Sequence, residues 1–328
     1  MNAPVYLLAL EGGGTRSQAV LLDENGRLLG EAVSTDVNTN FVAFEQAQAA
    51  VQVAVIRALK AAGVNGSDVQ HFAVGLVGPR FGAETFGHIC PQATYRYYGE
   101  REIIFARAGI YRPHGIALVA ATGATAFGIN RGDGRQLTAG GWGSLLGDEG
   151  SAYAIGLQGL RGAARAYEGR LDLPTGMVEA VCQHFGLERK NFRTDLVRLA
   201  YQKPLSRADI AGLAPVVSRL ALEGDPLARR IISKAADDLA ALALFAARKL
   251  FSAEEAFDVV IAGGLVKAGE LILASLRNKL GEEFPKSSLK VGSEQPALAL
   301  GRLSLHDIAQ GKEEDGIRNR DSWEILGL

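Results

Sequence analysis

The sequence predicts an α/β protein made of two similar domains that face each other across a cleft. One order of signals, namely strand, glycine-rich turn, strand, turn, strand and then helices, occurs twice, over residues 5–64 and 116–250. The chain has 328 residues, which is too long for one ordinary core. Its forty glycines gather in short motifs, which favours tight turns beside a ligand over a flexible low-complexity chain.

The first half begins with a hairpin of apolar strands. Val5–Leu10 reads as a buried strand, and the Asn25-Gly26 turn follows its antiparallel partner. A run of Ala, Val and Gln at helical spacing ends at Gly63, a residue typical of a helix stop. The expected strands are Val5–Leu10, Gln18–Asp23, Arg27–Ser34, His71–Val77 and Ala93–Tyr98, and the expected helices are Phe44–Ala62 and Glu102–Ala108.

The second half repeats the strand order and becomes mostly helical after Asp148. The expected strands are Ile116–Ala120, Ala126–Asn130, Leu137–Ala139 and Phe257–Ala262, and the expected helices are Ser151–Tyr167, Gly176–Phe185, Lys190–Tyr201, Ser206–Leu222, Pro226–Leu250, Gly269–Leu280 and Pro296–Gln310. We therefore expect an N-terminal domain over 1–115, a C-terminal domain over 116–310 and a charged tail over 311–328. The terminal helix is a candidate to pack back on the N-terminal domain.

Composition and charge argue against several classes of protein. The net charge of −1 argues against a broad basic surface for nucleic acid. Only Cys90 and Cys182 occur, and neither lies in a CxxC pair, so zinc and iron–sulfur sites lack support. No apolar run approaches the roughly 18 residues that a membrane span needs, and no signal segment is expected. We therefore expect a cytoplasmic protein with no nucleic-acid or membrane partner.

Three consecutive glycines, Gly12–Gly14, follow the first strand, between Glu11 and Thr15. Without Cβ atoms, backbone N–H groups can approach a phosphate and form an anion-binding nest, to which Thr15 adds a hydroxyl. Glu11 is placed to hold a magnesium-bound water, because a carboxylate aimed at phosphates would repel them. A strand follows the glycines, which excludes a Walker A loop and a dinucleotide fingerprint. A glycine-rich hairpin without a ligand is the alternative.

Three further motifs offer groups to a ligand. Ala121–Thr125 supplies N–H groups and hydroxyls in the corresponding turn of the second half, so two turns can clamp one polyphosphate. Gly140–Gly156 surrounds Trp142 and Asp148 with glycines, which favours a ligand loop; the alternatives are an interior tryptophan anchor and a helix N-cap. The Gly263-Gly264 pair after the late strand leaves room for a flat ring such as a nucleotide base, or is an ordinary strand–helix turn.

The four motifs, in this order, resemble the N-acetylglucosamine kinase group of the BadF/BadG/BcrA/BcrD ATPase family, within the sugar kinase, actin and heat-shock ATPase superfamily. The resemblance runs from about Val5 to about Ile308. Its most specific parts are EGGGTRS (Glu11–Ser17) and GGWGSLLGDEGSAY (Gly140–Tyr153), while EGDPLARRI and PALALG are weaker matches. It implies two RNase-H-like (actin-like ATPase) domains, with mixed sheets flanked by helices, that close over ATP, Mg²⁺ and a sugar.

The resemblance also assigns roles to residues. For the nucleotide these are Gly13, Gly14 and Thr15 in the first phosphate turn, Thr122 and Gly123 in the second, Gly212 nearby, and Gly263 and Gly264 at the adenosine. For the sugar these are Asn38, with Asn40 as a near competitor, and Gly141, Trp142, Gly143 and Asp148. Glu11 would hold the magnesium ion through water.

Two departures from the family pattern affect the reacting groups. The family places an aspartate as general base after the fourth strand of the first domain, and this position falls here on Glu100, with Glu102 as the less favoured alternate. Glutamate can accept the same proton, although its carboxylate lies one methylene further out. The second phosphate turn usually reads GTGS, whereas Ala121 and Ala124 replace its outer residues here.

The resemblance implies an ATP-dependent kinase that phosphorylates a hydroxyl of N-acetylglucosamine or a close relative, such as glucosamine or N-acetylmuramate. The two departures keep a second hypothesis open, a non-catalytic or weakly active member of the fold that binds sugar or nucleotide. A dehydratase-activating ATPase is less favoured, because that role needs cluster-ligating cysteines that Cys90 and Cys182 do not supply. A homodimer is the expected assembly.

Overall fold

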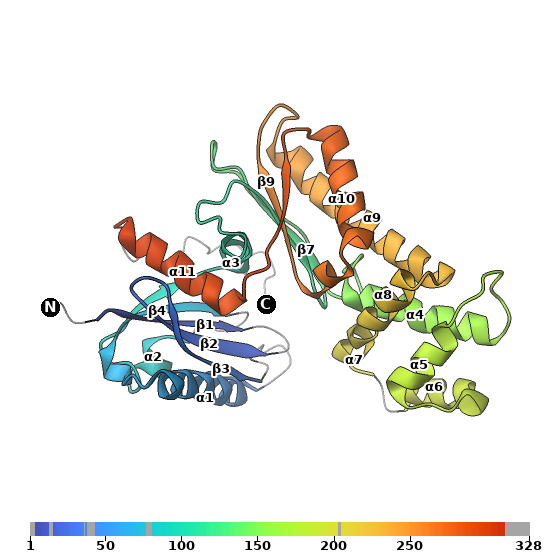
Figure 1. The fold of residues 1–328 in the computed structure, drawn as a ribbon, viewed down its shortest axis with the longest axis horizontal. Coiled ribbons are helices and arrows are strands. Elements are labelled where there is room, and N and C mark those ends of the chain that lie inside the picture. Colours follow the sequence, from blue (N-terminus) through green and yellow to red (C-terminus); the bar gives the residue numbers. More distant parts are fainter. Residues whose placement is uncertain are drawn as a thin grey trace. The chain divides into compact units, whose positions relative to one another are not determined.

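The computed structural model describes residues 4–12, 16–35, 37, 43–76, 81–202 and 205–311 of the chain (Figure 1). The chain divides into two compact units. The first unit contains residues 1–112 and 293–328, and the second contains residues 113–292. The chain therefore leaves the first unit before Pro113 and returns to it after Gly292.

The first unit is built on a five-stranded mixed sheet in the order β3-β2-β1-β4-β5. Its strands are β1 (Tyr6–Gly12), β2 (Ser17–Asp23), β3 (Leu28–Ser34), β4 (Val69–Leu76) and β5 (Thr94–Tyr97). β1 pairs antiparallel with β2, and β2 with β3, whereas β1 pairs parallel with β4, and β4 with β5. Its helical segments are α1 (Phe44–Ala62), η1 (Gly66–Asp68), α2 (Ala83–Phe86), α3 (Glu100–Ala106) and α11 (Pro296–Ala309).

Strand β1 is apolar from Leu7 to Leu10 because both of its faces are covered there. Leu8 and Leu10 lie in a hydrophobic cluster with α1, whereas Leu7 and Ala9 lie in another with α11. Successive side chains of a strand point to opposite faces, so a continuous apolar run satisfies both layers. Figure 1 shows α1 and α11 on the two sides of this sheet.

Helix α11 packs closely on the sheet through Gly301, in the PALALG segment. A Cβ atom at position 301 would lie 2.5 Å from Cδ1 of Leu22 and 3.4 Å from the Cβ of Ala9. A side chain there would push the helix away from β1 and β2. Close packing therefore explains this glycine without any ligand.

The second unit repeats the same topology. Its sheet has the order β10-β9-β6-β7-β8, with the pairs β6–β7 and β7–β8 antiparallel and the pairs β6–β9 and β9–β10 parallel. The strands are β6 (Gly115–Ala120), β7 (Ala124–Ile129), β8 (Gln136–Gly140), β9 (Asp258–Ala262) and β10 (Ser288–Val291). The helical segments are α4 (Ala152–Tyr167), α5 (Met177–Phe185), η2 (Arg189–Asn191), α6 (Phe192–Tyr201), α7 (Arg207–Gly212), α8 (Ala214–Leu222), α9 (Pro226–Leu250), η3 (Gly264–Ala268) and α10 (Glu270–Glu283).

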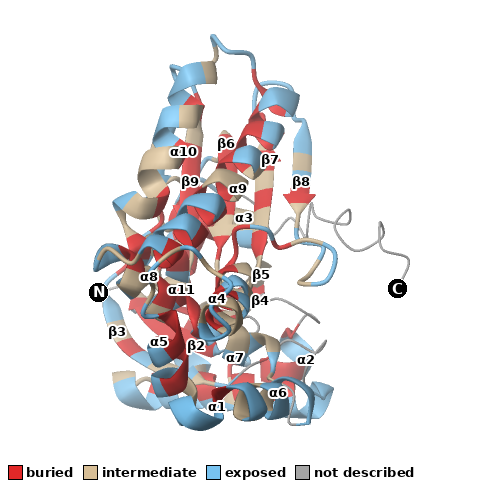
Figure 2. Ribbon diagram, turned by 90° about the vertical axis from the view of Figure 1, so that its right-hand side faces the viewer, coloured by how far each residue is buried: buried red, intermediate tan, exposed pale blue. Residues whose placement is uncertain are grey.

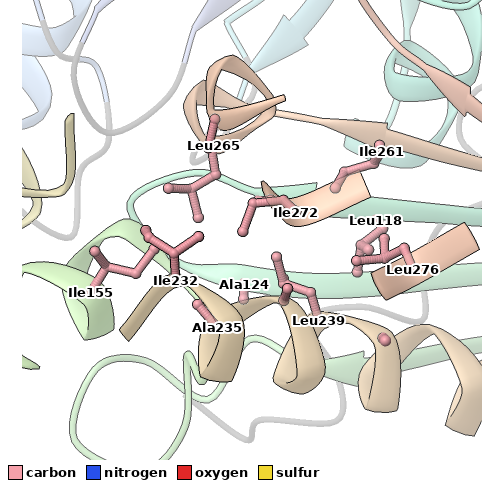
Figure 3. Close-up of a cluster of buried hydrophobic side chains, with 14 of the residues drawn as sticks. Leu118, Ala124, Ile155, Ile232, Ala235, Leu239, Ile261, Leu265, Ile272 and Leu276 are labelled. Atoms are coloured by element: carbon pink, nitrogen blue, oxygen red, sulfur yellow. The ribbon is translucent and has the colours of Figure 1, made fainter. Parts of the chain in front are cut away.

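The core of the second unit lies between its sheet and the helices α9 and α10. Leu118 and Ile261 of the sheet gather there with Leu239 of α9 and Leu276 of α10 (Figure 3). Figure 2 shows β6 and β9 largely buried and the outward faces of the helices exposed. This rigid core fixes the strand ends from which the candidate site is built.

Three glycines on one side of α4 let α7, α8 and α9 approach it. A Cβ atom at Gly156 would lie 1.9 Å from the carbonyl oxygen of Ile210 in α7. At Gly159 and Gly162 it would lie 2.9 Å from a methyl of Val217 and 2.8 Å from a methyl of Leu227. The spacing of three residues places all three on one helix face. Helix α7 is therefore held against the start of α4.

Two expectations about the elements were wrong. Ser206–Leu222 forms two helices, α7 and α8, because Pro215 in the first turn of α8 has no N–H to continue a helix. Strand β10 was not expected, since its four residues alternate between exposed and half-buried and carry little apolar signal.

Candidate functional site

Several of the expected site residues lie outside the described part of the chain. These are Gly13, Gly14 and Thr15 of the first glycine turn, together with Asn38 and Asn40. The described residues on either side of the first turn are Gly12 and Arg16, and Gly12 of β1 pairs with Ser17 of β2. The roles of these five residues stay predictions.

Glu11 stands near the end of β1, between Gln18 of β2 and Gly75 of β4. Its side chain is half-buried. The pKa of the carboxyl is raised from 4.5 to about 7, chiefly because burial removes water from the carboxylate and also because Glu100 adds negative charge. The guanidinium groups of Arg107 and Arg16 oppose this rise. Glu11 and Glu100 thus belong to one electrostatic cluster.

Glu100 is the first residue of α3 and follows Gly99, the N-cap. Helix α3 approaches the sheet at Gly75, where a Cβ atom would lie 2.4 Å from Cδ1 of Ile103. The Glu100 side chain is exposed to solvent at its surface. Neighbouring protein atoms nevertheless displace part of the water around its carboxyl, and this desolvation raises the pKa of Glu100. A carboxyl with a raised pKa is a stronger proton acceptor than an ordinary one.

Glu102, the alternate candidate for the base, is engaged elsewhere. Its Oε1 accepts hydrogen bonds from Nε and Nη2 of Arg101, at 3.0 and 2.6 Å. This ion pair occupies one oxygen of the Glu102 carboxylate. The local geometry therefore favours Glu100 over Glu102.

In the second unit, the expected phosphate turn joins β6 to β7. Its carbonyl groups are occupied, since Ala121 O accepts from Ala152 N at 2.9 Å and Thr122 O accepts from Tyr153 N at 3.3 Å. Both donors belong to the first turn of α4. Within the described residues, the N–H groups of Thr122 and Gly123 have no hydrogen-bond partner. The turn thus offers two backbone donors to an anion.

The side chain of Asp148 holds the turn between β6 and β7 in place. Its Oδ1 accepts from Ala124 N at 3.1 Å, and its Oδ2 accepts from Nη2 of Arg207 at 2.5 Å. The residue is only 3% exposed and has a φ of 62°, the one positive φ of a non-glycine residue in the described chain. It does not cap α4, because Ser151 does so by accepting from Ala154 N. The N-cap alternative for Asp148 was wrong.

Arg207 was missed by sequence reasoning. It begins α7, 59 residues beyond Asp148, and no local motif connects the two. A Cβ atom at Gly123 would lie 2.7 Å from its Nη2 and 2.8 Å from Oδ1 of Asp148. A side chain at position 123 would therefore displace the guanidinium of Arg207 or the carboxylate of Asp148.

The loop after β8 is held by glycines at positive φ and carries apolar side chains outward. Gly141 and Gly143 have φ of 73° and 80°. Between them Trp142 is 67% exposed, so the interpretation of an interior anchor was wrong. Leu145 and Leu146 are exposed as well. Exposed apolar side chains on a glycine-framed loop are available for contact with a ligand.

The glycine pair after β9 lies beside the turn that joins β6 to β7. Gly263 has a φ of 123°, and a Cβ atom there would lie 2.2 Å from the carbonyl oxygen of Ala120. Gly264 faces open space. Gly212, the other expected nucleotide position, is the exposed last residue of α7, the helix that begins with Arg207. The second unit thus brings Thr122, Gly123 and Gly263 together, next to the Asp148 carboxylate that holds the turn.

No group of three His, Cys, Asp or Glu side chains in the described part of the chain is placed to hold a metal ion. A magnesium ion bound mainly by phosphate oxygens and water, with one carboxylate, needs no such group. None of the described helices is both long and apolar enough to span a membrane.

Comparisons with known proteins show which family this chain belongs to. A model of the BadF/BadG/BcrA/BcrD ATPase family matches residues 10–295. The N-acetyl-D-glucosamine kinase of Dictyostelium discoideum is 26% identical over 326 residues, which cover 93% of this chain and 99% of that protein. The N-acetylmuramic acid/N-acetylglucosamine kinase of Clostridium acetobutylicum is 26% identical over 240 residues, or 71% of this chain and 76% of that protein.

A solved structure shares the fold. The crystal structure of a candidate N-acetylglucosamine kinase from Chromobacterium violaceum has a TM-score of 0.66 at 24% identity, and the match covers 91% of this chain and 98% of that chain. The predicted fold class is confirmed as two mixed five-stranded sheets with flanking helices, of the actin-like ATPase type.

Proposed function

Because the chain belongs to the BadF/BadG/BcrA/BcrD ATPase family, which implies ATP binding, we propose that it is an ATP-dependent kinase for a hydroxyl of an amino sugar. The proposed substrate is N-acetylglucosamine or a close relative such as glucosamine or N-acetylmuramate, as the names of the two relatives suggest. One observation carries the proposal. The buried carboxylate of Asp148 joins a turn with two unoccupied N–H groups to the loop that presents Trp142.

The nucleotide is proposed to bind through glycine turns. Thr122 and Gly123 would donate N–H groups to its phosphates, as would Gly13, Gly14 and Thr15 of the first turn. Gly263 and Gly264 would lie against the adenosine, near Gly212. The fit is supported by positions 123 and 263, where a side chain would collide with Arg207 or with the backbone of Ala120.

Glu11 is the proposed partner of the magnesium ion, through a bound water. When bound, Mg²⁺ supplies positive charge that offsets the charge of the phosphates. A Glu11 carboxyl with a pKa of about 7 is poised between its neutral and ionised forms at neutral pH. A cation nearby favours the ionised form, so Glu11 would lose its proton as the metal complex binds.

Glu100 is the proposed general base. It would accept the proton of the sugar hydroxyl as the hydroxyl oxygen forms a bond to the γ-phosphorus and the bond from that phosphorus to the ADP oxygen breaks. The raised pKa of Glu100 suits this role. Asn38, Gly141, Trp142 and Gly143 would hold the sugar. Asp148, whose buried carboxylate accepts from Ala124 N and from Arg207, would act at the sugar site by holding the loop in place.

A coupled assay of ADP release over a panel of sugars tests the proposal. The panel contains N-acetylglucosamine, glucosamine and N-acetylmuramate, with glucose as the sugar that lacks the amino group. We expect ADP release to depend on one of the amino sugars. ATP binding without product on any of them would instead indicate a non-catalytic sensor.

A further inference from the structure

We propose that Arg207 is a phosphate-binding residue, which completes an anion site with the N–H groups of Thr122 and Gly123 and contacts the phosphoryl groups of a bound nucleotide. The proposal rests on the nucleotide part of the proposed function. All of these groups belong to the second unit.

The guanidinium of Arg207 is positioned beside the turn that contains Gly123. The Nη2 atom of Arg207 would lie 2.7 Å from a Cβ atom at Gly123, so the guanidinium is directly against the turn. An anion that accepts hydrogen bonds from the N–H groups of Thr122 and Gly123 must lie close to this turn. A guanidinium is well suited to phosphate, because its planar array of donors matches two phosphate oxygens at once.

Arg207 has a hydrogen-bond donor that no described residue uses. Arg207 gives Nη2 to Asp148, but its Nε is buried and has no hydrogen-bond partner in the described chain. Buried donors of native proteins nearly always find an acceptor, so an unpaired one next to two unpaired backbone N–H groups points to a missing acceptor. A phosphoryl group supplies several acceptor oxygens. The side chain is 33% exposed, so a ligand can reach it.

Asp148 forms an ion pair with Arg207. Its carboxylate holds the guanidinium in place and offsets part of the positive charge. Arg207 therefore keeps one fixed orientation before a nucleotide arrives, which reduces the conformational entropy lost on binding. In this arrangement Asp148 orients Arg207, and Arg207 contacts the phosphate. The opposite arrangement, in which Arg207 serves only to hold Asp148, makes a different prediction.

Calorimetric titration without sugar separates the two arrangements. The ligands are Mg²⁺-ATP and adenosine, and the proteins are the wild type, Arg207→Gln, Arg207→Lys, Asp148→Asn and the control Arg219→Ala, which removes an exposed arginine paired with Glu223. We expect Arg207→Gln to weaken ATP binding roughly 10- to 100-fold, since a hydrogen bond to a charged group is lost. Arg207→Lys should recover part of this loss. Adenosine affinity and the Arg219→Ala protein should be unchanged.

Asp148→Asn gives the deciding comparison. If Arg207 contacts phosphate and Asp148 only orients it, Asp148→Asn weakens ATP binding less than Arg207→Gln does. Equal losses of ATP affinity in Arg207→Gln and Asp148→Asn would overturn the proposal, as would wild-type affinity in Arg207→Gln. Because no sugar is present, these outcomes do not depend on whether a sugar is phosphorylated. A wild-type protein that binds no ATP would refute both proposals.

Discussion

Gly263 lies directly against the carbonyl of Ala120, with a hypothetical Cβ atom only 2.2 Å from that oxygen. The contact joins the end of β9 to the end of β6, the strand that leads into the turn of Thr122 and Gly123. Its geometry requires glycine twice over, because φ is also 123°. The neighbouring Gly264 has free space around it. The pair therefore offers a matched test of packing against ligand contact.

Gly263→Ala is expected to lower the free energy of unfolding by about 2–4 kcal/mol, because the methyl group collides with backbone that cannot move without disturbing the sheet. Urea unfolding followed by circular dichroism measures the loss. Gly264→Ala is the control and should unfold like the wild type. Equal stability of the two variants would contradict the packing that we describe.

Gly75→Ala is expected to reduce turnover by displacing α3 and with it Glu100. The added methyl meets Cδ1 of Ile103 at 2.4 Å, which costs about 1–3 kcal/mol of stability. Ile103→Val removes that methyl, so the double variant Gly75→Ala/Ile103→Val should regain stability and turnover. If the second substitution restores neither, the contact between Gly75 and Ile103 does not position the helix.

The raised pKa of Glu11 predicts how stability depends on pH. Between the unfolded pKa of 4.5 and the folded pKa of about 7, the folded state binds more protons than the unfolded state. Stability from this group is therefore full below pH 4.5 and falls as the pH rises toward 7, by roughly 1–2 kcal/mol for a half-buried carboxyl that solvent partly screens.

Glu11→Gln should remove this dependence. Urea unfolding at pH 5 and pH 7.5, without nucleotide or magnesium, compares the wild type with the variant. We expect the variant to lose less stability than the wild type between the two pH values. Identical slopes for both proteins would show that the Glu11 carboxyl titrates normally. The same variant should bind Mg²⁺-ATP more weakly, which a calorimetric titration measures.

Trp142→Ala is expected to raise the KM for the sugar roughly 3- to 10-fold by removing an aromatic contact, while ATP affinity and thermal stability stay unchanged. The side chain is 67% exposed, so its loss leaves no cavity in the core. Leu222→Ala, which truncates another exposed apolar residue of the same unit, is the control. A large fall in melting temperature would mean that Trp142 acts in packing instead.

The sequence predicted the first strands of each sheet and the turns between them, because the evidence for these elements is local. An apolar run such as Leu7–Leu10 and a turn such as Asn25-Gly26 specify a strand and a hairpin from neighbouring residues alone. The same reasoning placed Thr122, Gly123 and Gly263 in turns directly after strands, since a glycine after a strand is a local signal. It missed β10, a short strand with little apolar content.

Side-chain partners could not be predicted in the same way. The contact of Asp148 with Arg207 spans 59 residues and depends on how Gly156 of α4 admits α7. The exposure of Trp142 likewise depends on the positive φ of Gly141 and Gly143, which turn the loop outward. Such features arise from tertiary packing, which residue patterns record only indirectly.

Transfer of labelled phosphate tests the central claim most directly. The wild type, Glu100→Gln and the control Glu102→Gln are incubated with Mg²⁺-ATP labelled at the γ-phosphate and with N-acetylglucosamine, glucosamine or N-acetylmuramate. We expect a labelled sugar phosphate in equal amount to ADP for the wild type and Glu102→Gln. We expect a fall of roughly 100-fold or more for Glu100→Gln, with ATP binding retained. Labelled inorganic phosphate with no sugar product, or full activity of Glu100→Gln, would contradict the proposed kinase mechanism.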